Sequence, residues 1–283
     1  MRMGTRNRRS ARWGSLIAAL MTIAVLAPLP ATAAGGKSEA KGAARSGDDF
    51  EWHGRIAAGR AIEVKGVNGG IVAEPSTGSE VEVVARKTAH RSDPDQVTIE
   101  VVEHEDGVTV CAVYPTPRGY PPNECKPGEG GRMNTRNNDV QVEYTVRLPA
   151  GVRFIGRTVN GSIEARRLAA DAEAYTVNGS IGIETGGTAR ATTVNGSIAA
   201  EMGTALREPL EFETVNGGIT LTVPAATGAD VRCSTVNGDI MSDFPLTVRG
   251  KFSRRSLNGT IGRGGPQLMM TTVNGDIRLR SAS

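Results

Sequence analysis

The side chains in this sequence that could bind a ligand or be modified recur in one motif, an Asn-Gly pair followed by Ser, Thr, Gly or Asp. With Ser or Thr in third place, the triplet matches the acceptor pattern for N-glycosylation. With Asp in third place, at Asp239 and Asp276, the carboxylates suggest calcium, but the successive Gly-Gly and Asp of calcium-binding nonapeptides are missing. The motif coincides with a longer repeat, so we interpret its asparagines as structural corner residues. They are Asn68, Asn160, Asn178, Asn195, Asn216, Asn237, Asn258 and Asn274.

Other catalytic patterns do not emerge from the sequence. The histidines His53, His90 and His104 are scattered and lack the spacing of metal ligands. The sequence shows no nucleotide-binding glycine loop, no nucleophile elbow and no ordered Ser-His-Asp or Cys-His set. We therefore predict a protein that is not an enzyme and that carries no metal or cofactor.

The longer repeat is the phrase Thr-Val-Asn-Gly-x-Ile, which begins at Thr158, Thr176, Thr193, Thr214, Thr235 and Thr272. Ser256 to Ile261 is a divergent copy, and Val67 to Ile71 is an isolated early one. Repetition at intervals of about 20 residues is typical of stacked repeat architectures. The sequence therefore predicts a repeat fold, and few aromatic residues with 36 glycines favour short strands over helices.

Side-chain alternation predicts how each repeat folds. Apolar residues before the phrase lie an even number of positions from its Thr, as do Ala172 and Ala174 from Thr176. Apolar residues after it are in step with its Ile, yet Thr and Ile are five positions apart. One continuous strand cannot bury both sets, because successive strand residues face opposite sides. We expect a strand, a corner at Asn-Gly, where both residues tolerate positive φ, and a second strand.

Two folds fit this pattern. Asn-Gly between alternating runs is a strong hairpin signal, which would give an antiparallel meander. All copies look alike, however, and one copy per ~20 residues suits one coil per repeat. We therefore predict an all-β fold, a parallel β-solenoid with an N-terminal β cap region, in which the corner asparagines form a ladder.

The chain divides into four predicted parts. Residues 1–33 have a basic start, an apolar stretch and a small-residue cleavage motif, typical of a signal peptide. Residues 34–49 are expected to be a flexible leader. Residues 50–150 contain strand-like runs and form either a sandwich-like cap or degenerate repeats. Residues 151–283 carry the β-solenoid repeats.

Charge and cysteines indicate the compartment. The net charge of +3 falls to about −2 without the five arginines of the signal, so nothing favours nucleic acid as a partner. After signal removal we expect no membrane span. Cys111 and Cys125 flank a Pro/Gly-rich segment and are predicted to form a disulfide, which suits an oxidising compartment. Cys233 alternates with Val231 and is interpreted as a small buried hydrophobic residue.

These residues also carry a resemblance. The TVNGSI repeats, the segment from Val110 to Cys125, and Arg136 to Val140 running to Leu148 to Val152 resemble the bacterial "putative adhesin" domain family. The resemblance covers roughly Phe50 to the C-terminus. It implies a β-solenoid in an exported envelope or surface protein, and it offers no catalytic residues to transfer.

The resulting hypothesis is a non-catalytic exported protein, acting as an adhesin or a cell-envelope interaction scaffold. It would lie in the periplasm, at the cell surface or outside the cell. Its partner would be an unidentified protein or glycan, and self-association through the ends of the stack is a further expectation. The alternatives are a carbohydrate-active β-helix enzyme and a periplasmic sensing or regulatory domain.

Overall fold

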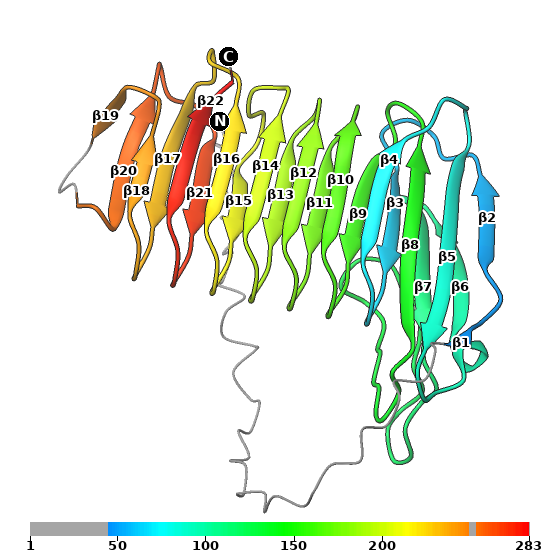
Figure 1. Ribbon diagram of the computed structural model, residues 1–283. Coiled ribbons are helices and arrows are strands. Elements are labelled where there is room, and N and C mark those ends of the chain that lie inside the picture. Colours follow the sequence, from blue (N-terminus) through cyan, green and yellow to red (C-terminus); the bar gives the residue numbers. More distant parts are fainter. Residues whose placement is uncertain (1–44, 249–252, 283) are drawn as a thin grey trace, which may run out of the picture. The chain divides into compact units, whose positions relative to one another are not determined.

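The computed structural model describes residues 45–248 and 253–282, and its strands form two large sheets (Figure 1). The signal peptide and most of the leader lie outside the described residues. Arg45–Ser46, within the predicted flexible leader, instead forms β1 and pairs with β5. Among the described residues the structure has no α-helix, and none of its helices is long and apolar enough to cross a membrane. The all-β prediction is confirmed.

The first sheet, called sheet A, runs mostly parallel. In spatial order it contains β1 (Arg45–Ser46), β5 (Val81–Ala89), β8 (Gln141–Leu148), β4 (Ile71–Pro75), β10 (Ile163–Leu168), β12 (Ile181–Thr185), β14 (Ile198–Met202), β16 (Ile219–Val223), β22 (Ile277–Ser281) and β18 (Ile240–Ser242), with β2 (Phe50–Gly54) also paired to β5.

The second sheet, called sheet B, lies behind it. In spatial order it contains β19 (Leu246–Val248), β20 (Ser256–Ile261), β17 (Ala229–Ser234), β21 (Gln267–Thr271), β15 (Leu210–Glu213), β13 (Ala189–Thr192), β11 (Ala172–Tyr175), β9 (Arg153–Arg157), β3 (Ala61–Lys65), β7 (Gly107–Val113) and β6 (Thr98–His104). A short 3₁₀ turn, Pro94–Gln96, precedes β6.

Each copy of the phrase joins one strand of sheet B to one strand of sheet A. The pair β11–β12, for example, meets at Thr176 to Ser180, and its neighbours on both sides are parallel pairs in the same register. The parallel arrangement is the predicted one, and the antiparallel meander is excluded. Strand pairs joined by a corner are called rungs below.

Inward-facing residues of the two sheets form one hydrophobic core. It contains the alanines before the phrase and the isoleucines after it, as the alternation predicted. Glu211 and Arg232, which occupy the alternate positions of their strands, are exposed. Burying apolar surface in this way stabilises the fold by ~25 cal/mol per Å².

The rungs do not follow chain order at either end. The C-terminal rung β21–β22 lies between β15–β16 and β17–β18, although β17–β18 precedes it in the sequence. At the other end, β3–β4 lies between β9–β10 and the pair β7, β8. The rungs nearest the two chain ends, β3–β4 and β21–β22, therefore have a neighbouring strand on both sides in each sheet. β7 and β8 lie outside β3–β4, and β17–β18 lies outside β21–β22.

The N-terminal region contains both a stacked rung and antiparallel strands. Its rung β3–β4 has a corner at Asn68 and stacks like the other rungs. Beside it, β7 and β8 also pair in parallel, but a disulfide-closed loop replaces their corner. Antiparallel strands β5 and β6 then cover the outer edges. At the opposite end, β20 and β19 cover the edge of sheet B in the same antiparallel way.

Tyr144 offers a test of packing in the N-terminal region. Its side chain is fully buried, and among the described residues its hydroxyl finds no hydrogen-bond partner. An unsatisfied buried hydroxyl costs about 1–3 kcal/mol. Tyr144→Phe is therefore expected to raise the free energy of unfolding by about 1 kcal/mol in a denaturant titration. Tyr114→Phe is the control, because the Tyr114 hydroxyl donates to the carbonyl of Val140 at 2.8 Å and its loss should destabilise the fold. Stabilisation by both variants would contradict this account.

Candidate functional site

The corners form a ladder of side-chain amides along one edge of the stack. Each Asn Nδ2 donates to the Oδ1 of the Asn in the next rung, at 2.7–2.9 Å, and all six links point the same way. In spatial order the ladder contains Asn68, Asn160, Asn178, Asn195, Asn216, Asn274 and Asn237. The amides are thus used within the ladder, and its role is to hold neighbouring rungs in register.

A second row of hydrogen bonds explains why the phrase begins with Thr. The Thr176 hydroxyl is buried and donates to the carbonyl of Gly161 in the neighbouring rung at 2.9 Å, and Thr193 does the same to Gly179. A buried hydroxyl must be satisfied, and here the bond also connects one rung to the next.

Two predictions about the corners are wrong. Asn258 is not a corner, because Ser256–Ile261 runs as the extended strand β20, antiparallel to β17. Positive φ is also not the reason for Asn-Gly. No corner Asn has positive φ, and among the corner glycines only Gly69 and Gly275 do. Close approach is the reason, since a Cβ on Gly196 would lie 2.0 Å from the carbonyl oxygen of Gly179.

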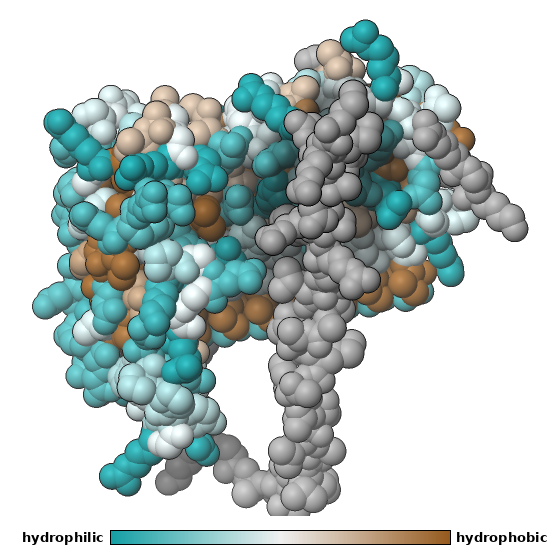
Figure 2. Space-filling model, turned by 180° about the vertical axis from the view of Figure 1, so that it is seen from behind, coloured by the Kyte–Doolittle hydropathy of each residue, from teal (hydrophilic) through white to brown (hydrophobic). Residues whose placement is uncertain are grey.

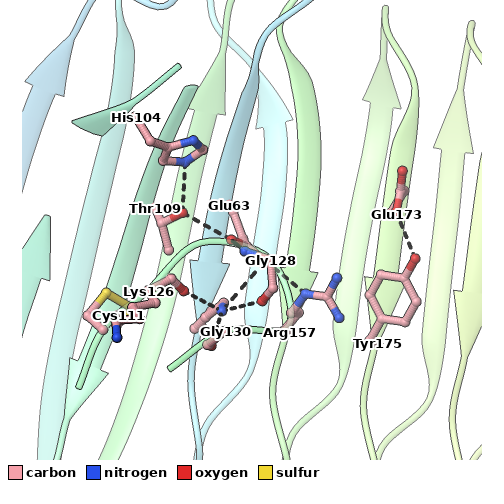
Figure 3. Close-up of polar contacts among 12 residues, drawn as sticks. Glu63, His104, Thr109, Cys111, Lys126, Gly128, Gly130, Arg157, Glu173 and Tyr175 are labelled. Atoms are coloured by element: carbon pink, nitrogen blue, oxygen red, sulfur yellow. Dashed lines mark hydrogen bonds and ion pairs between the residues drawn. A yellow bond between two sulfur atoms is a disulfide. The ribbon is translucent and has the colours of Figure 1, made fainter. Parts of the chain in front are cut away.

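The densest polar cluster lies on the outward face of sheet B, beneath the disulfide-closed loop (Figure 3). Its centre is Glu63, which is only 3% exposed. Glu63 Oε1 accepts from Arg157 Nε at 2.8 Å, and Oε2 accepts from the Thr109 hydroxyl at 3.0 Å and from the Gly128 N–H at 2.8 Å. His104 Nε2 lies 3.0 Å from the same hydroxyl. The carboxylate is therefore fully engaged with partners from β7, β9 and the loop.

Lys65 fastens the loop to the sheet. Its ammonium donates to the carbonyls of Lys126 at 2.6 Å and Gly130 at 3.1 Å, and also to that of Gly128. Burial lowers the pKa of Lys65, while the nearby Glu63 opposes this and the Arg157 charge adds to it. The Cys111–Cys125 disulfide, predicted from the sequence, holds the same loop covalently.

Arg157 connects this cluster to the next rungs. Its guanidinium stacks over the Tyr175 ring at 4.2 Å, and the Tyr175 hydroxyl donates to Glu173 at 2.7 Å. Burial raises the pKa of Tyr175, and the Glu173 charge adds to the effect, so the phenol stays protonated. A cavity of about 320 Å³ lies between the loop and the sheet, lined among others by Lys65, Met133 and Arg157.

The hydrogen bonds of the cluster hold the loop to sheet B, and the cluster is called the latch below. Glu63, Lys65 and Arg157 each have partners within the fold. Among the described residues, no three His, Cys, Asp or Glu side chains gather as metal ligands. Cys233 is buried, and burial raises the pKa of its thiol to about 12, which fits the predicted inert residue.

The latch itself can be tested with Lys65→Met. The variant removes three hydrogen bonds to loop carbonyls, so we expect the loop from Tyr114 to Val140 to open more often, by about 1–3 kcal/mol. Amide hydrogen exchange resolved by peptide measures this opening. Lys126→Met is the control, because that ammonium is exposed and pairs only with exposed Glu124. Unchanged exchange in Lys65→Met would contradict the latch.

Sequence reasoning missed this cluster. Glu63 stands between Ile62 and Val64, and strict alternation places it on the solvent side. It does lie on that side, but a loop more than 60 residues away covers it. The nearest available signal was the cysteine pair, which indicated that the loop is held close to β7.

Comparison with known families identifies the repeats. Residues 158–280 match the family model described as Toastrack DUF4097. The repeat region is similar to a Toastrack domain. The resemblance to the adhesin-domain family is confirmed over these residues.

Solved structures give only a distant likeness to this chain. One is described as a putative cell adhesion protein from Clostridium sporogenes, with 9% identity and a TM-score of 0.41, covering 83% of this chain and 100% of that one. Another is described as a putative adhesin from Bacteroides fragilis, with 11% identity and a TM-score of 0.32, covering 82% of this chain and 97% of that one. No curated protein matches the chain. At these identities and TM-scores the likeness carries no argument about activity or partners.

Proposed function

We propose that this chain is an exported, non-catalytic binding scaffold of the cell envelope or cell surface. In this proposal the stacked rungs are a short parallel β-solenoid with about 20 residues per rung, closed by an N-terminal cap. The disulfide supports export, because such bonds persist in oxidising compartments. The partner is an extended protein or glycan that lies across the rungs of sheet A.

The observation that carries the proposal is a hollow of about 540 Å³ on the outward face of sheet A, over β10, β12, β14 and β16. Gly182 and Ala199 form its low floor, since they lie in register on neighbouring strands, where glycine has no side chain and alanine has only a methyl group. Glu184 and Glu201, also in register, line one side with exposed carboxylates. Neighbouring strands at ~4.8 Å spacing thus present two carboxylates in a row, and a groove across several strands suits an extended polymer.

The opposite face differs from this hollow. Figure 2 shows the molecule from behind, where small hydrophobic patches are scattered among polar residues outside the grey atoms. On sheet B, Arg190 pairs with Glu208 at 2.6 Å. Three acidic residues line the sheet A hollow: Glu164 pairs with Arg166, whereas Glu184 and Glu201 have no ion-pair partner among the described residues. They remain available for basic or hydroxyl groups of a partner.

Two experiments test the proposal. Whole cells that carry a tagged copy are treated with protease, and accessible tag indicates surface exposure, whereas protection with release on outer-membrane disruption indicates the periplasm. Purified full-length chain is then screened against envelope glycans, matrix proteins and basic peptides. The double variant Glu184→Lys with Glu201→Lys should weaken binding by at least about tenfold, while Glu211→Lys on the outward face of sheet B should not.

The results discriminate among the candidate functions. Equal binding by both variants would contradict the sheet A hollow as the binding face. Cytoplasmic retention would contradict export. Shortening of a glycan during the screen would favour the alternative of a carbohydrate-active enzyme, and capture of a periplasmic regulator would favour a sensing domain.

A further inference from the structure

The sequence contains eight Asn-Gly pairs, seven at corners and one in β20, and their different surroundings allow their reactivity to be compared. Such pairs deamidate when the backbone nitrogen of Gly attacks the side-chain amide carbon of Asn, because glycine places no side chain in the way. The nitrogen must first lose its proton, so an N–H that donates a structural hydrogen bond is protected until the bond opens.

Six corners are protected in this way. The Gly N–H of each donates to the Asn carbonyl of the neighbouring rung at 2.8–3.0 Å. The donors are Gly69, Gly161, Gly179, Gly196, Gly217 and Gly275. Their asparagines are also held by the ladder, on both sides in all interior rungs. Asn258, the remaining pair, lies in β20 with paired strands on both sides.

Asn237-Gly238 differs because it is the last corner of the stack. Within residues 45–248 and 253–282, the structure shows no acceptor for the Gly238 N–H and no donor to Asn237 Oδ1. Asn237 Nδ2 still donates to Asn274 at 2.8 Å, and the adjoining Val236 is 54% exposed to water.

Gly238 approaches its neighbouring rung as closely as an interior corner does. A Cβ on Gly238 would lie 2.0 Å from the Gly275 carbonyl oxygen, and one on Gly196 would lie 2.0 Å from that of Gly179. Neither of these two glycines has positive φ, so the hydrogen bond of the Gly N–H is what distinguishes them.

We propose that Asn237 is the preferred site of spontaneous deamidation in the folded protein. The Gly238 nitrogen forms a bond to Asn237 Cγ, the Cγ–Nδ2 bond breaks, and ammonia leaves with the proton from Gly238. Water then opens the cyclic imide at either carbonyl and leaves aspartate or isoaspartate. The reaction needs only water, and it adds one negative charge to the chain.

This modification weakens the outermost rung. The new carboxylate replaces the amide that donates to Asn274 Oδ1. It also lies near two further acidic residues, Asp239 and Asp276, which are in contact because the Asp239 N–H donates to Asp276 Oδ1 at 3.0 Å. A carboxylate oxygen of residue 237 then lies against Asn274 Oδ1 in place of the hydrogen bond, and two acceptors repel each other. The rung β17–β18 is then less firmly held against β21–β22, so the protein carries a slow, irreversible change at one end of its stack.

The test is incubation of the full chain in mildly alkaline ¹⁸O-labelled water at physiological temperature, followed by peptide mass spectrometry with isoaspartate detection. We expect label at position 237 to accumulate at least about tenfold faster than at positions 178, 195 or 216. In denaturant the eight pairs should react at similar rates. Asn237→Gln should remove the fast site, while Asn195→Gln should leave it unchanged.

Two outcomes would overturn the proposal. One is equal labelling of all corners in the folded chain. The other is faster labelling at an interior corner or at Asn258 than at Asn237.

Discussion

Replacing Gly196 by Ala is expected to lower the free energy of unfolding by about 3 kcal/mol. The added Cβ would lie 2.0 Å from the carbonyl oxygen of Gly179 and 2.5 Å from its carbon, both in the neighbouring rung. Backbone atoms cannot rotate away as a side chain can, so the two rungs must separate locally. Forced overpacking of this kind costs typically 1–3 kcal/mol. Separation also stretches the bond from the Gly179 N–H to the Asn195 carbonyl, which joins the same two rungs.

The matched control is Gly182→Ala on the outward face of β12. There the added Cβ meets nothing closer than the Glu164 Cγ at 4.0 Å. Alanine in a strand interior is better than glycine by about 0.5–1 kcal/mol, so this variant should be neutral or slightly stabilised. Denaturant titration of both variants decides the matter. Similar losses for the two would show that the glycines act through chain entropy and not through close approach of rungs.

The contrast between these glycines shows what the sequence could predict. Alternation around Thr176 and Ile181 was enough to place the core, because burial of every second residue follows from strand geometry alone. The corner followed from the odd spacing between Thr and Ile. The physical reason for Gly at the corner could not be predicted from the sequence. It depends on the distance to the neighbouring rung, which the sequence of a single repeat does not determine.

The spatial order of the rungs at the ends of the stack also could not be predicted from the sequence. The phrases that begin at Thr235 and Thr272 are identical, and from the sequence either could stack on the rung that contains Asn216. The connection through β19 and β20 decides the matter, because β20 occupies the outer edge of β17 and leaves only the inner edge for β21. The same strand explains Asn258, whose copy lacks the leading Thr that connects rungs. Pairing between distant segments overrides the local pattern in both cases.

The burial of Glu63 has a similar cause. Its position in β3 predicts exposure, and its partners Arg157, Thr109 and Gly128 come from three segments distant in sequence. A buried carboxylate is tolerated because each of its oxygens is hydrogen-bonded. The polar cluster could be found only once the loop had been placed over sheet B.

Replacing Ile219 by Asp is expected to cost at least about 4 kcal/mol and to unfold the middle of the stack. Ile219 is fully buried in β16, between Ile198 of β14 and Ile277 of β22. A carboxylate in this place would have apolar neighbours on both sides. Because β22 is held by β16 on one side and β18 on the other, the C-terminal rungs should be lost together with β16.

Thr220→Asp is the control for Ile219→Asp, because Thr220 is the next residue of the same strand and faces outward. It is a better control than Glu213, which alternation predicts to be exposed but which is half-buried in the structure. Burial, together with the charge of Glu211, raises the pKa of Glu213, so a change of its charge is not neutral. Thermal melts followed by circular dichroism should show a large loss for Ile219→Asp and little change for Thr220→Asp. Equal melts would mean that the register of β16, and with it the assignment of inner and outer faces along sheet A, is wrong.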